Sequence, residues 1–384
     1  MSEIKVNSIK GVGASAAAIT VNNTDGTCTA NITNNLSNRN LIINGAMQVA
    51  QRGTSFADPA NGTFILDRFS MRNSSGTPAF TFSQDSDAPH GFYNSLKVAC
   101  TTADTSPASG SISRITYKTE AHDLQPLAKG TSSAKASTLS FYVKTNKTGV
   151  YTVFVYDDDN NRMFSASYTV SDTNWNRYTI DVPADTSGAI NDDNGAGYVI
   201  HWGLSLGSNR TSGSLASTWA TYATANEHVG NVNFADNTSN VWAITGVQFE
   251  VGSVATDFEH RSFGQELALC QRYFQKSFDA TVTPAVGSSK CVYTFTRPYA
   301  AGYHEGLGND YIVEMRSQPS VVFYPTAATG SGSVGQVTYY DGSWSHVTPV
   351  YNTSNSTNKR LVFTMNTNSS TTLVQYNYTL SAEL

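Results

Sequence analysis

The stretch from 246 to 274 constrains the fold most, because the period of its apolar residues changes within it. Val247, Phe249 and Val251 alternate with polar side chains, which is typical of a strand with one buried face. A Gly-Ser pair ends this pattern, and the apolar residues that follow recur at spacings of three and four, as in a helix. The remaining sequence favours β-structure, so we expect one short helix to join two β-domains.

The helix has recognisable ends in the sequence. Ser262 and Gln265 have the spacing of a capping box, and Arg272 and Lys276 are placed as the basic residues of a last turn. These signals predict a helix of roughly 12–14 residues, within a connector at 261–277. Its apolar positions spread wider than one stripe and are Leu267, Leu269, Cys270, Tyr273 and Phe274.

Residues 41–260 are predicted to form an antiparallel jelly-roll sandwich. Short runs with alternating polarity follow one another, separated by polar turns and without helical patterns between them. One strand is expected at 63–70, and a strand at 149–156 is expected to pair with its neighbour at 162–170.

Residues 278–384 are predicted to form a second β-sandwich, a tip domain. Strands are expected at 281–286 and 311–315, and long loops at 298–308, 326–333 and 341–359. Loops held by a rigid sheet are common sites of recognition. The aromatic residues that we expect to bind a ligand there are Tyr299, Tyr303 and Trp344.

The loop-rich stretch at 207–238 is also a candidate for ligand binding. Trp219 and Tyr222 stand there among polar residues. An aromatic face stacks on a sugar ring as readily as it packs in an interface, so both interpretations are open.

The densest acidic run is Asp157, Asp158 and Asp159, in a turn between two expected strands. Carboxylate oxygens are ligands for Ca²⁺, but the spacing is not that of an EF-hand. A solvated turn is the simpler interpretation, with a Ca²⁺ site as the alternative. No other cofactor is expected.

Composition excludes several classes of function. The net charge is −5 and no block of Lys and Arg occurs, so we expect no nucleic-acid partner. No apolar run approaches 18 residues, so we expect no membrane insertion. Motifs of hydrolases, zinc proteases and P-loop proteins are missing from the sequence, so we expect a protein that is not an enzyme.

Residues 1–40 are too few for a core of their own. Ile4, Val6 and Ile9 alternate with polar residues, and Asp25-Gly26 between two short β-prone runs predicts a hairpin. We predict an attachment arm that docks by strand addition or trimer winding, with a free tail as the alternative. The start of the chain is a poor signal peptide, so we expect folding in a cytoplasm.

Three blocks carry a resemblance to a known family. They are NLIINGAMQVAQRG at 40–53, LDRF at 66–69 and GVQFEVG at 246–252. Together they resemble tail fibres of bacteriophages, notably those of marine and cyanobacterial hosts, in which similar blocks open and close a jelly-roll domain. Phe69 stands where Trp is common in the family, and Phe249 stands where Leu is common; both changes keep a large apolar side chain.

The resemblance implies a function and an assembly. It implies a virion tail protein, assembled in the host cytoplasm, that recognises a host surface polysaccharide or outer-membrane receptor. A homotrimer is implied, with attachment to an adaptor or nozzle protein of the tail through the N-terminal arm. SEIKVN at 2–7 and MRSQPSV at 315–321 resemble the attachment and tip segments of such fibres. A structural adaptor without receptor binding, or a polysaccharide depolymerase, are the alternatives.

Overall fold

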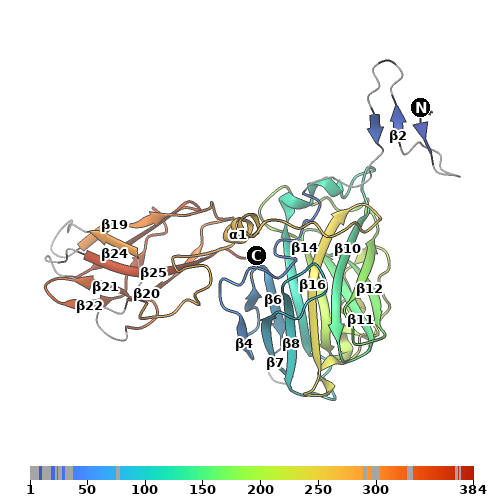
Figure 1. The fold of residues 1–384 in the computed structure, drawn as a ribbon, viewed down its shortest axis with the longest axis horizontal. Coiled ribbons are helices and arrows are strands. Elements are labelled where there is room, and N and C mark those ends of the chain that lie inside the picture. Colours follow the sequence, from blue (N-terminus) through green and yellow to red (C-terminus); the bar gives the residue numbers. More distant parts are fainter. Residues whose placement is uncertain are drawn as a thin grey trace, which may run out of the picture.

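The computed structural model confirms the predicted all-β architecture, with a β-sandwich on each side of α1 (Phe263–Gln271) (Figure 1). No helix in the described part of the chain is long and apolar enough to cross a membrane. The structure describes residues 8–10, 19–21, 24, 28–30, 38–74, 78–288, 292–295, 303–326, 332–367, 371 and 373–384.

The larger sandwich consists of two antiparallel sheets. The six-stranded sheet has the order β13 (Asn176–Val182), β10 (Ser137–Thr145), β16 (Val241–Val251), β8 (Ser95–Thr102), β7 (Ala79–Asp85), β4 (Ser55–Ala57). The seven-stranded sheet has the order β15 (Ala220–Thr221), β12 (Arg162–Val170), β11 (Gly149–Asp157), β14 (Ala196–Leu206), β9 (Ile112–Glu120), β6 (Phe69–Asn73), β5 (Phe64–Leu66). The predicted pairing of 149–156 with 162–170 is confirmed as β11 and β12.

One hydrophobic core lies between these sheets. Leu139, Phe141 and Val143 of β10 face it from one side, and Val153 and Val155 of β11 face it from the other; all five are fully buried. Burying a large apolar side chain contributes roughly 1.5–3 kcal/mol each, so the alternation of these strands determines which face of each sheet turns inward.

The single strand predicted at 63–70 is wrong, because the chain turns between β5 and β6. Arg68 has a φ of 72°, a left-handed conformation that strands do not use. The carboxylate of Asp67 accepts hydrogen bonds from the backbone N and the Nε2 of Gln51, both at 2.7 Å. These bonds fix the turn, and the Arg68 side chain donates to the carbonyl of Lys118 in β9.

The blocks that carried the sequence resemblance lie against each other. Asn40 Nδ2 donates to the carbonyl of Val247 at 3.1 Å, and Asn40 Oδ1 accepts from the backbone N of Phe249 at 3.1 Å. Gly45 lies so close to β16 that a Cβ atom there would stand 2.1 Å from the Val247 carbonyl oxygen. The opening and closing blocks therefore form one structural unit.

The predicted capping box is confirmed, but the helix is shorter than predicted. Ser262 and Gln265 satisfy each other's backbone N–H groups at the N-terminus of α1. The helix ends at Gln271 after 9 residues, and the chain enters β17 (Phe274–Lys276). The last-turn role predicted for Lys276 is wrong, because β17 pairs with the C-terminal strand β25 (Leu373–Ser381).

The smaller sandwich surrounds β25. Its larger sheet has the order β17-β25-β21-β22, and β18 and β20 also pair with β25; its second sheet has the order β19-β24-β23. The bounds are β18 (Val292–Phe295), β19 (Tyr303–Asp310), β20 (Ser320–Tyr324), β21 (Val337–Tyr340), β22 (Trp344–Val347), β23 (Val350–Tyr351) and β24 (Arg360–Asn366).

Several boundaries predicted in this sandwich are wrong. No strand forms at 281–286, where Lys276 Nζ donates to the carbonyls of Ala280 and Val282 at 2.9 and 2.6 Å and turns the chain. No strand forms at 311–315 either. Instead, β19 lies partly within the predicted loop at 298–308, and β22 and β23 lie within the one at 341–359.

The two sandwiches meet through ion pairs that are buried or partly buried. Glu383, just after β25, accepts from Arg52 Nη2 at 2.9 Å and forms an ion pair with Arg68. Arg272 at the end of α1 donates to both carboxylate oxygens of Glu120, each at 2.8 Å. Both contacts connect the second half of the chain to the jelly roll.

Three short strands precede the larger sandwich and stand apart from it (Figure 1). They are β1 (Ser8–Ile9), β2 (Ile19–Val21) and β3 (Cys28–Ala30), and the predicted pairing of the two strands around Asp25-Gly26 is confirmed by β2 and β3. Ile9 is exposed in β1. Ile4 and Val6, the other two residues predicted for attachment, lie outside the described residues.

Candidate functional site

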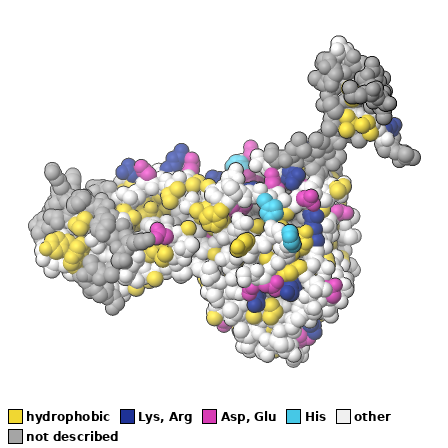
Figure 2. All heavy atoms as spheres, viewed as in Figure 1, with side chains coloured by type: hydrophobic (Ala, Val, Ile, Leu, Met, Phe, Trp, Pro, Cys, Tyr) yellow, Lys and Arg dark blue, Asp and Glu magenta, His cyan; other side chains and the backbone are white. Residues whose placement is uncertain are grey.

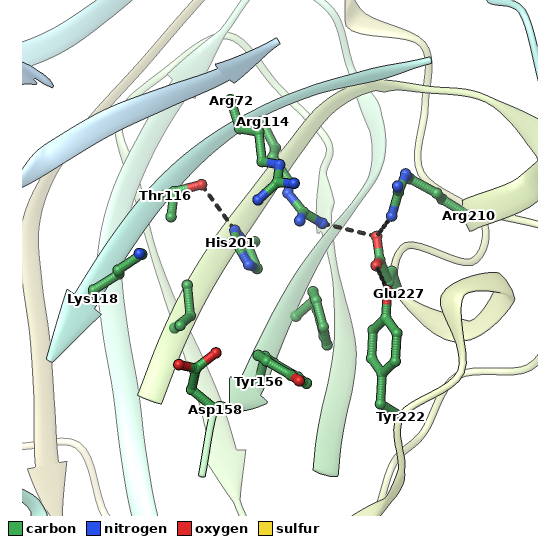
Figure 3. Close-up of a pocket in the computed structure, with 12 residues that line it drawn as sticks. Arg72, Arg114, Thr116, Lys118, Tyr156, Asp158, His201, Arg210, Tyr222 and Glu227 are labelled. Carbon is green, nitrogen blue, oxygen red and sulfur yellow. Dashed lines mark hydrogen bonds and ion pairs between the residues drawn. The ribbon is translucent and has the colours of Figure 1, made fainter. Parts of the chain in front are cut away.

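A hollow of about 270 Å³ lies on the outer face of the seven-stranded sheet (Figure 3). Its lining combines charged, aromatic and apolar side chains: Arg72, Arg114, Thr116, Lys118, Phe154, Tyr156, Asp158, Val199, His201, Arg210, Tyr222 and Glu227.

Strand alternation supplies most of this lining. In β9, Ile115 and Tyr117 point into the core, so Arg114, Thr116 and Lys118 point outward. The neighbouring strands β14 and β11 show the same alternation, with apolar side chains inward and the lining residues outward.

The strand register places these outward residues in rows across the sheet. His201 is paired with Thr116 on one side and with Phe154 on the other. In the next row Arg72 of β6 stands directly opposite Arg114 of β9. Two like charges directly opposite each other destabilise a sheet, so this second row needs compensation.

Part of the compensation comes from the 207–238 loop. Glu227 is buried and accepts from Arg114 Nη1 at 2.8 Å, from Arg210 Nη1 at 2.6 Å and from the Tyr222 hydroxyl at 2.5 Å. One carboxylate therefore fixes two guanidinium groups and one aromatic ring at the edge of the hollow (Figure 3).

The same loop is held on the sheet by a second set of bonds. Asn231 Oδ1 accepts from the backbone N of Thr152 at 2.9 Å, and the Thr152 hydroxyl lies 2.9 Å from His228 Nδ1. Gly203 allows this close approach, since a Cβ atom there would stand 2.8 Å from both His228 Nδ1 and Asn231 Oδ1. The loop is thus a fixed part of the site.

His201 forms the floor of the hollow as a neutral ring. Its Nδ1 lies 2.9 Å from the Thr116 hydroxyl, and its ring stacks on Phe154 with centroids 5.2 Å apart. Burial, together with the nearby charge of Arg114, holds the pKa of His201 well below its usual value. The positive charge of the site therefore comes from the arginines and the lysine.

Two of those cations, Arg114 and Lys118, have a lowered pKa. Burial lowers the pKa of Arg114 to about 10, with Arg210 and Arg72 acting in the same direction and Glu227 against it. Burial also lowers the pKa of Lys118; the charge of Asp158 acts against burial, and the neighbouring arginines act with it. Burial is the first cause of both shifts, and the charge of Arg72 acts in the same direction on both groups.

Aromatic rings form another part of the hollow. The rings of Tyr156 and Tyr222 meet edge to face with centroids 5.2 Å apart, and Phe154 lies 6.1 Å from Tyr222. The Tyr156 hydroxyl donates to Asn161 Oδ1 at 3.1 Å. The hollow therefore presents both flat apolar surface and hydrogen-bonding groups.

Of the two aromatic candidates in the 207–238 loop, the structure brings only Tyr222 into the hollow. Trp219 packs instead against the core, with its ring 5.2 Å from that of Tyr198 and its Nε1 donating to the Pro183 carbonyl at 2.8 Å. The packing interpretation of Trp219 agrees with this geometry.

The three aspartates considered for Ca²⁺ have separate surroundings. Asp157 is buried and forms an ion pair with Lys129 at 2.6 Å, and Asp159 accepts from the backbone N of Asn191 at 3.0 Å. Only Asp158 reaches the hollow. Within the described residues, no three His, Cys, Asp or Glu side chains gather as a metal site would require.

The candidates of the second sandwich lie in the other domain from the hollow. Trp344 begins β22 and packs beside Tyr340, with ring centroids 5.1 Å apart. Tyr303 begins β19, a strand rather than the predicted loop. Tyr299 lies outside the described residues.

Sequence reasoning missed most of the lining, including Arg72, His201 and Glu227. One signal was present: the two cations Arg114 and Lys118 flank Thr116 on the polar side of an alternating strand. The other lining residues come from strands and loops far apart in the sequence, and only the register brings them together.

No family model matches the chain, and no curated protein matches it. Among solved structures, it is similar to a family 11 carbohydrate-binding module from Clostridium thermocellum, with 11% identity, 53% of this chain and 99% of that chain covered and a TM-score of 0.28. It is also similar to a putative sugar-binding protein from Bacteroides thetaiotaomicron, with 11% identity, coverages of 56% and 100% and a TM-score of 0.30. A third is an N-terminal CBM22 tandem domain from Paenibacillus barcinonensis, with 8% identity, coverages of 91% and 100% and a TM-score of 0.28. The function therefore has to be inferred from the site itself.

Proposed function

We propose that the protein binds a saccharide in the hollow on the outer face of the seven-stranded sheet. One observation carries this proposal: the rings of Tyr156 and Tyr222 line the same hollow as three polar side chains that are free to bind a ligand. These are Arg72, Lys118 and Asp158, whose side chains have no hydrogen bond or ion pair within the described chain.

A sugar combines the properties that such a lining requires. Its ring has an apolar face that stacks on aromatic side chains, and its hydroxyl groups both donate and accept hydrogen bonds. Pockets for small molecules usually hold about 300–1,000 Å³. At about 270 Å³, the hollow suits a short segment of a glycan whose remainder extends into solvent.

Calorimetric titration with a panel of oligosaccharides tests the proposal. Tyr156→Ala removes an aromatic face and only one weak hydrogen bond, so it should reduce affinity about 10-fold without unfolding the protein. Tyr93→Ala is the matched control, because Tyr93 is 83% exposed and does not line the hollow. Equal affinities for the wild type and Tyr156→Ala would refute this location of the site.

We further propose that this saccharide belongs to a host-cell surface and that the protein is a bacteriophage tail fibre. The support is the resemblance of the blocks at 40–53, 66–69 and 246–252. In this proposal, the short strands β1 to β3 belong to the arm that attaches to an adaptor or nozzle protein of the tail. Virions carrying Tyr156→Ala should assemble normally but adsorb poorly.

A homotrimer belongs to the same proposal. Phe263 and Leu269 of α1 and the nearby Ile312 are exposed, and apolar side chains gather over this part of the surface in Figure 2. Exposed apolar patches of this kind often mark contacts between subunits. Light scattering should give a solution mass about three times 41.3 kDa. A monomer that persists at high concentration would overturn this part.

Two alternatives predict different results. A structural tail adaptor would leave adsorption unchanged in the Tyr156→Ala virions. A polysaccharide depolymerase would release reducing ends from a host polysaccharide, which a binding protein would not.

A further inference from the structure

The hollow holds more positive than negative charge. The charged side chains of its lining are four cations and two carboxylates: Arg72, Arg114, Lys118, Arg210, Asp158 and Glu227. His201 adds no charge, since its pKa lies well below its usual value because of burial. The net charge of the whole chain is −5, so this excess of positive charge is a local feature.

The two carboxylates are distributed unevenly among the cations. Glu227 accepts from both Arg114 and Arg210, and these two are the lining cations with which it forms ion pairs in the described chain. Arg72 and Lys118 make no ion pair within the described chain. Asp158 lies near enough to Lys118 to act on it electrostatically, but the two form no ion pair within the described chain.

The position of Arg72 makes the imbalance more severe. Arg72 is the cross-strand partner of Arg114, so two guanidinium groups project from the same row of the sheet. Arg114 is buried, and its Nε has no hydrogen-bond partner among the described residues. The buried cation has an unsatisfied donor and lies beside a second cation without an ion pair. An anion bound there forms charge-assisted hydrogen bonds and reduces the repulsion between the two cations.

We propose that the saccharide is acidic and that Arg72 and Lys118 bind its carboxylate or sulfate group at the mouth of the hollow. The planar fork of a guanidinium matches the oxygens of either group, and the lysine adds a mobile point charge. Tyr156 and Tyr222 then contact the sugar ring that bears the group. This inference rests on the proposed saccharide site and narrows its ligand to acidic sugars.

Titration calorimetry of the full chain with three probes tests the inference. The probes are oligogalacturonate, which carries carboxylates, a carrageenan oligosaccharide, which carries sulfates, and a neutral cello-oligosaccharide. At least one acidic probe should bind about 10-fold or more tightly than the neutral one. Its affinity should fall when NaCl is raised from about 20 to about 200 mM, because the exposed part of the site is screened.

Charge-removing variants locate the effect. Arg72→Met and Lys118→Met should each reduce affinity for the preferred acidic probe about 10-fold, while affinity for the neutral probe changes less than about 3-fold. Arg360→Met, in the exposed β24 terminus of the other sandwich, is the matched control and should change neither. Thermal melting should show both hollow variants folded, since neither side chain holds an ion pair in the described chain.

The outcomes separate this inference from the proposed function. Equal affinity for acidic and neutral probes, or acidic binding that survives both hollow variants, would overturn the acidic ligand and keep the saccharide site. Binding that is independent of Tyr156 as well as of the two cations would overturn both. A preference for one acidic probe identifies the group that is recognised.

Discussion

Replacing Glu383 by alanine should destabilise the protein strongly, although this residue is the second from the end of the chain. Its carboxylate accepts a hydrogen bond from Arg52 Nη2 at 2.9 Å and forms an ion pair with Arg68, whose side chain is 1% exposed. Burial alone would lower the pKa of Arg68, and the carboxylate of Glu383 with the rings of Tyr273 and Tyr117 raises it above its usual value.

The magnitude follows from what the variant leaves behind. Without Glu383, the Arg68 guanidinium keeps the Lys118 carbonyl at 2.6 Å and the rings of Tyr273 and Tyr117, whose centroids lie 3.4 and 5.5 Å from its Cζ. Removing one partner of a buried ion pair costs about 3–5 kcal/mol, because a buried charge stays uncompensated. Arg52 is less affected, since Asp67 lies 3.7 Å from its Nη1.

Guanidinium unfolding of wild type and variants measures this effect. Glu314→Ala is the matched control, because its pair with Lys359 is exposed on both sides and should contribute about 0–1 kcal/mol. The double variant Arg68→Met with Glu383→Leu should recover much of the loss, since apolar side chains can replace a buried pair. A cost of Glu383→Ala below about 1 kcal/mol would refute the role of this carboxylate.

Three further predictions concern stability. His201 and His228 have pKa values well below 6.5, first because of burial and second because of Arg114, so below that pH the unfolded chain binds more protons than the folded one. The free energy of unfolding should therefore fall below pH 6.5 by up to about 1.4 kcal/mol per pH unit for each histidine. Unfolding titrations at several pH values should show that His228→Asn removes the contribution of one histidine to this pH dependence. Ser262→Ala should cost about 0.5–2 kcal/mol in the same assay through loss of the α1 cap, and an unchanged midpoint would contradict this. Gly45→Ala should lower Tm sharply, since its methyl group would overlap the Val247 carbonyl. A variant as stable as the wild type would contradict this and would show that β16 can shift to accommodate the methyl group.

Local patterns predicted the elements that local forces determine. The capping box at Ser262 and Gln265 and the pairing of β11 with β12 follow from residues close together in the sequence. Helix length was overestimated, because the 3.6-residue period of the apolar positions continues past Gln271 while pairing with β25 pulls Phe274 into a strand. The two paired strands lie about a hundred residues apart in the sequence, so local sequence patterns do not predict that they pair.

The candidate site depended even more on distant contacts. Asp158 and Tyr222 were noticed in the sequence, one as a metal ligand and one as an aromatic in a loop, but nothing linked them. Arg72 and Glu227 meet Arg114 only because β6 pairs with β9 and the 207–238 loop folds over the same face. Such a site becomes visible once the register is known.

Hydroxyl-radical footprinting with a saturating oligosaccharide tests the central claim most directly, because it reports which aromatic side chains the ligand covers. Oxidation of Tyr156 and Tyr222 should fall when the ligand is bound, while oxidation of Trp344 in the other sandwich should not change. Protection of Trp344 with unchanged oxidation of both tyrosines would contradict the account and place recognition in the C-terminal domain instead.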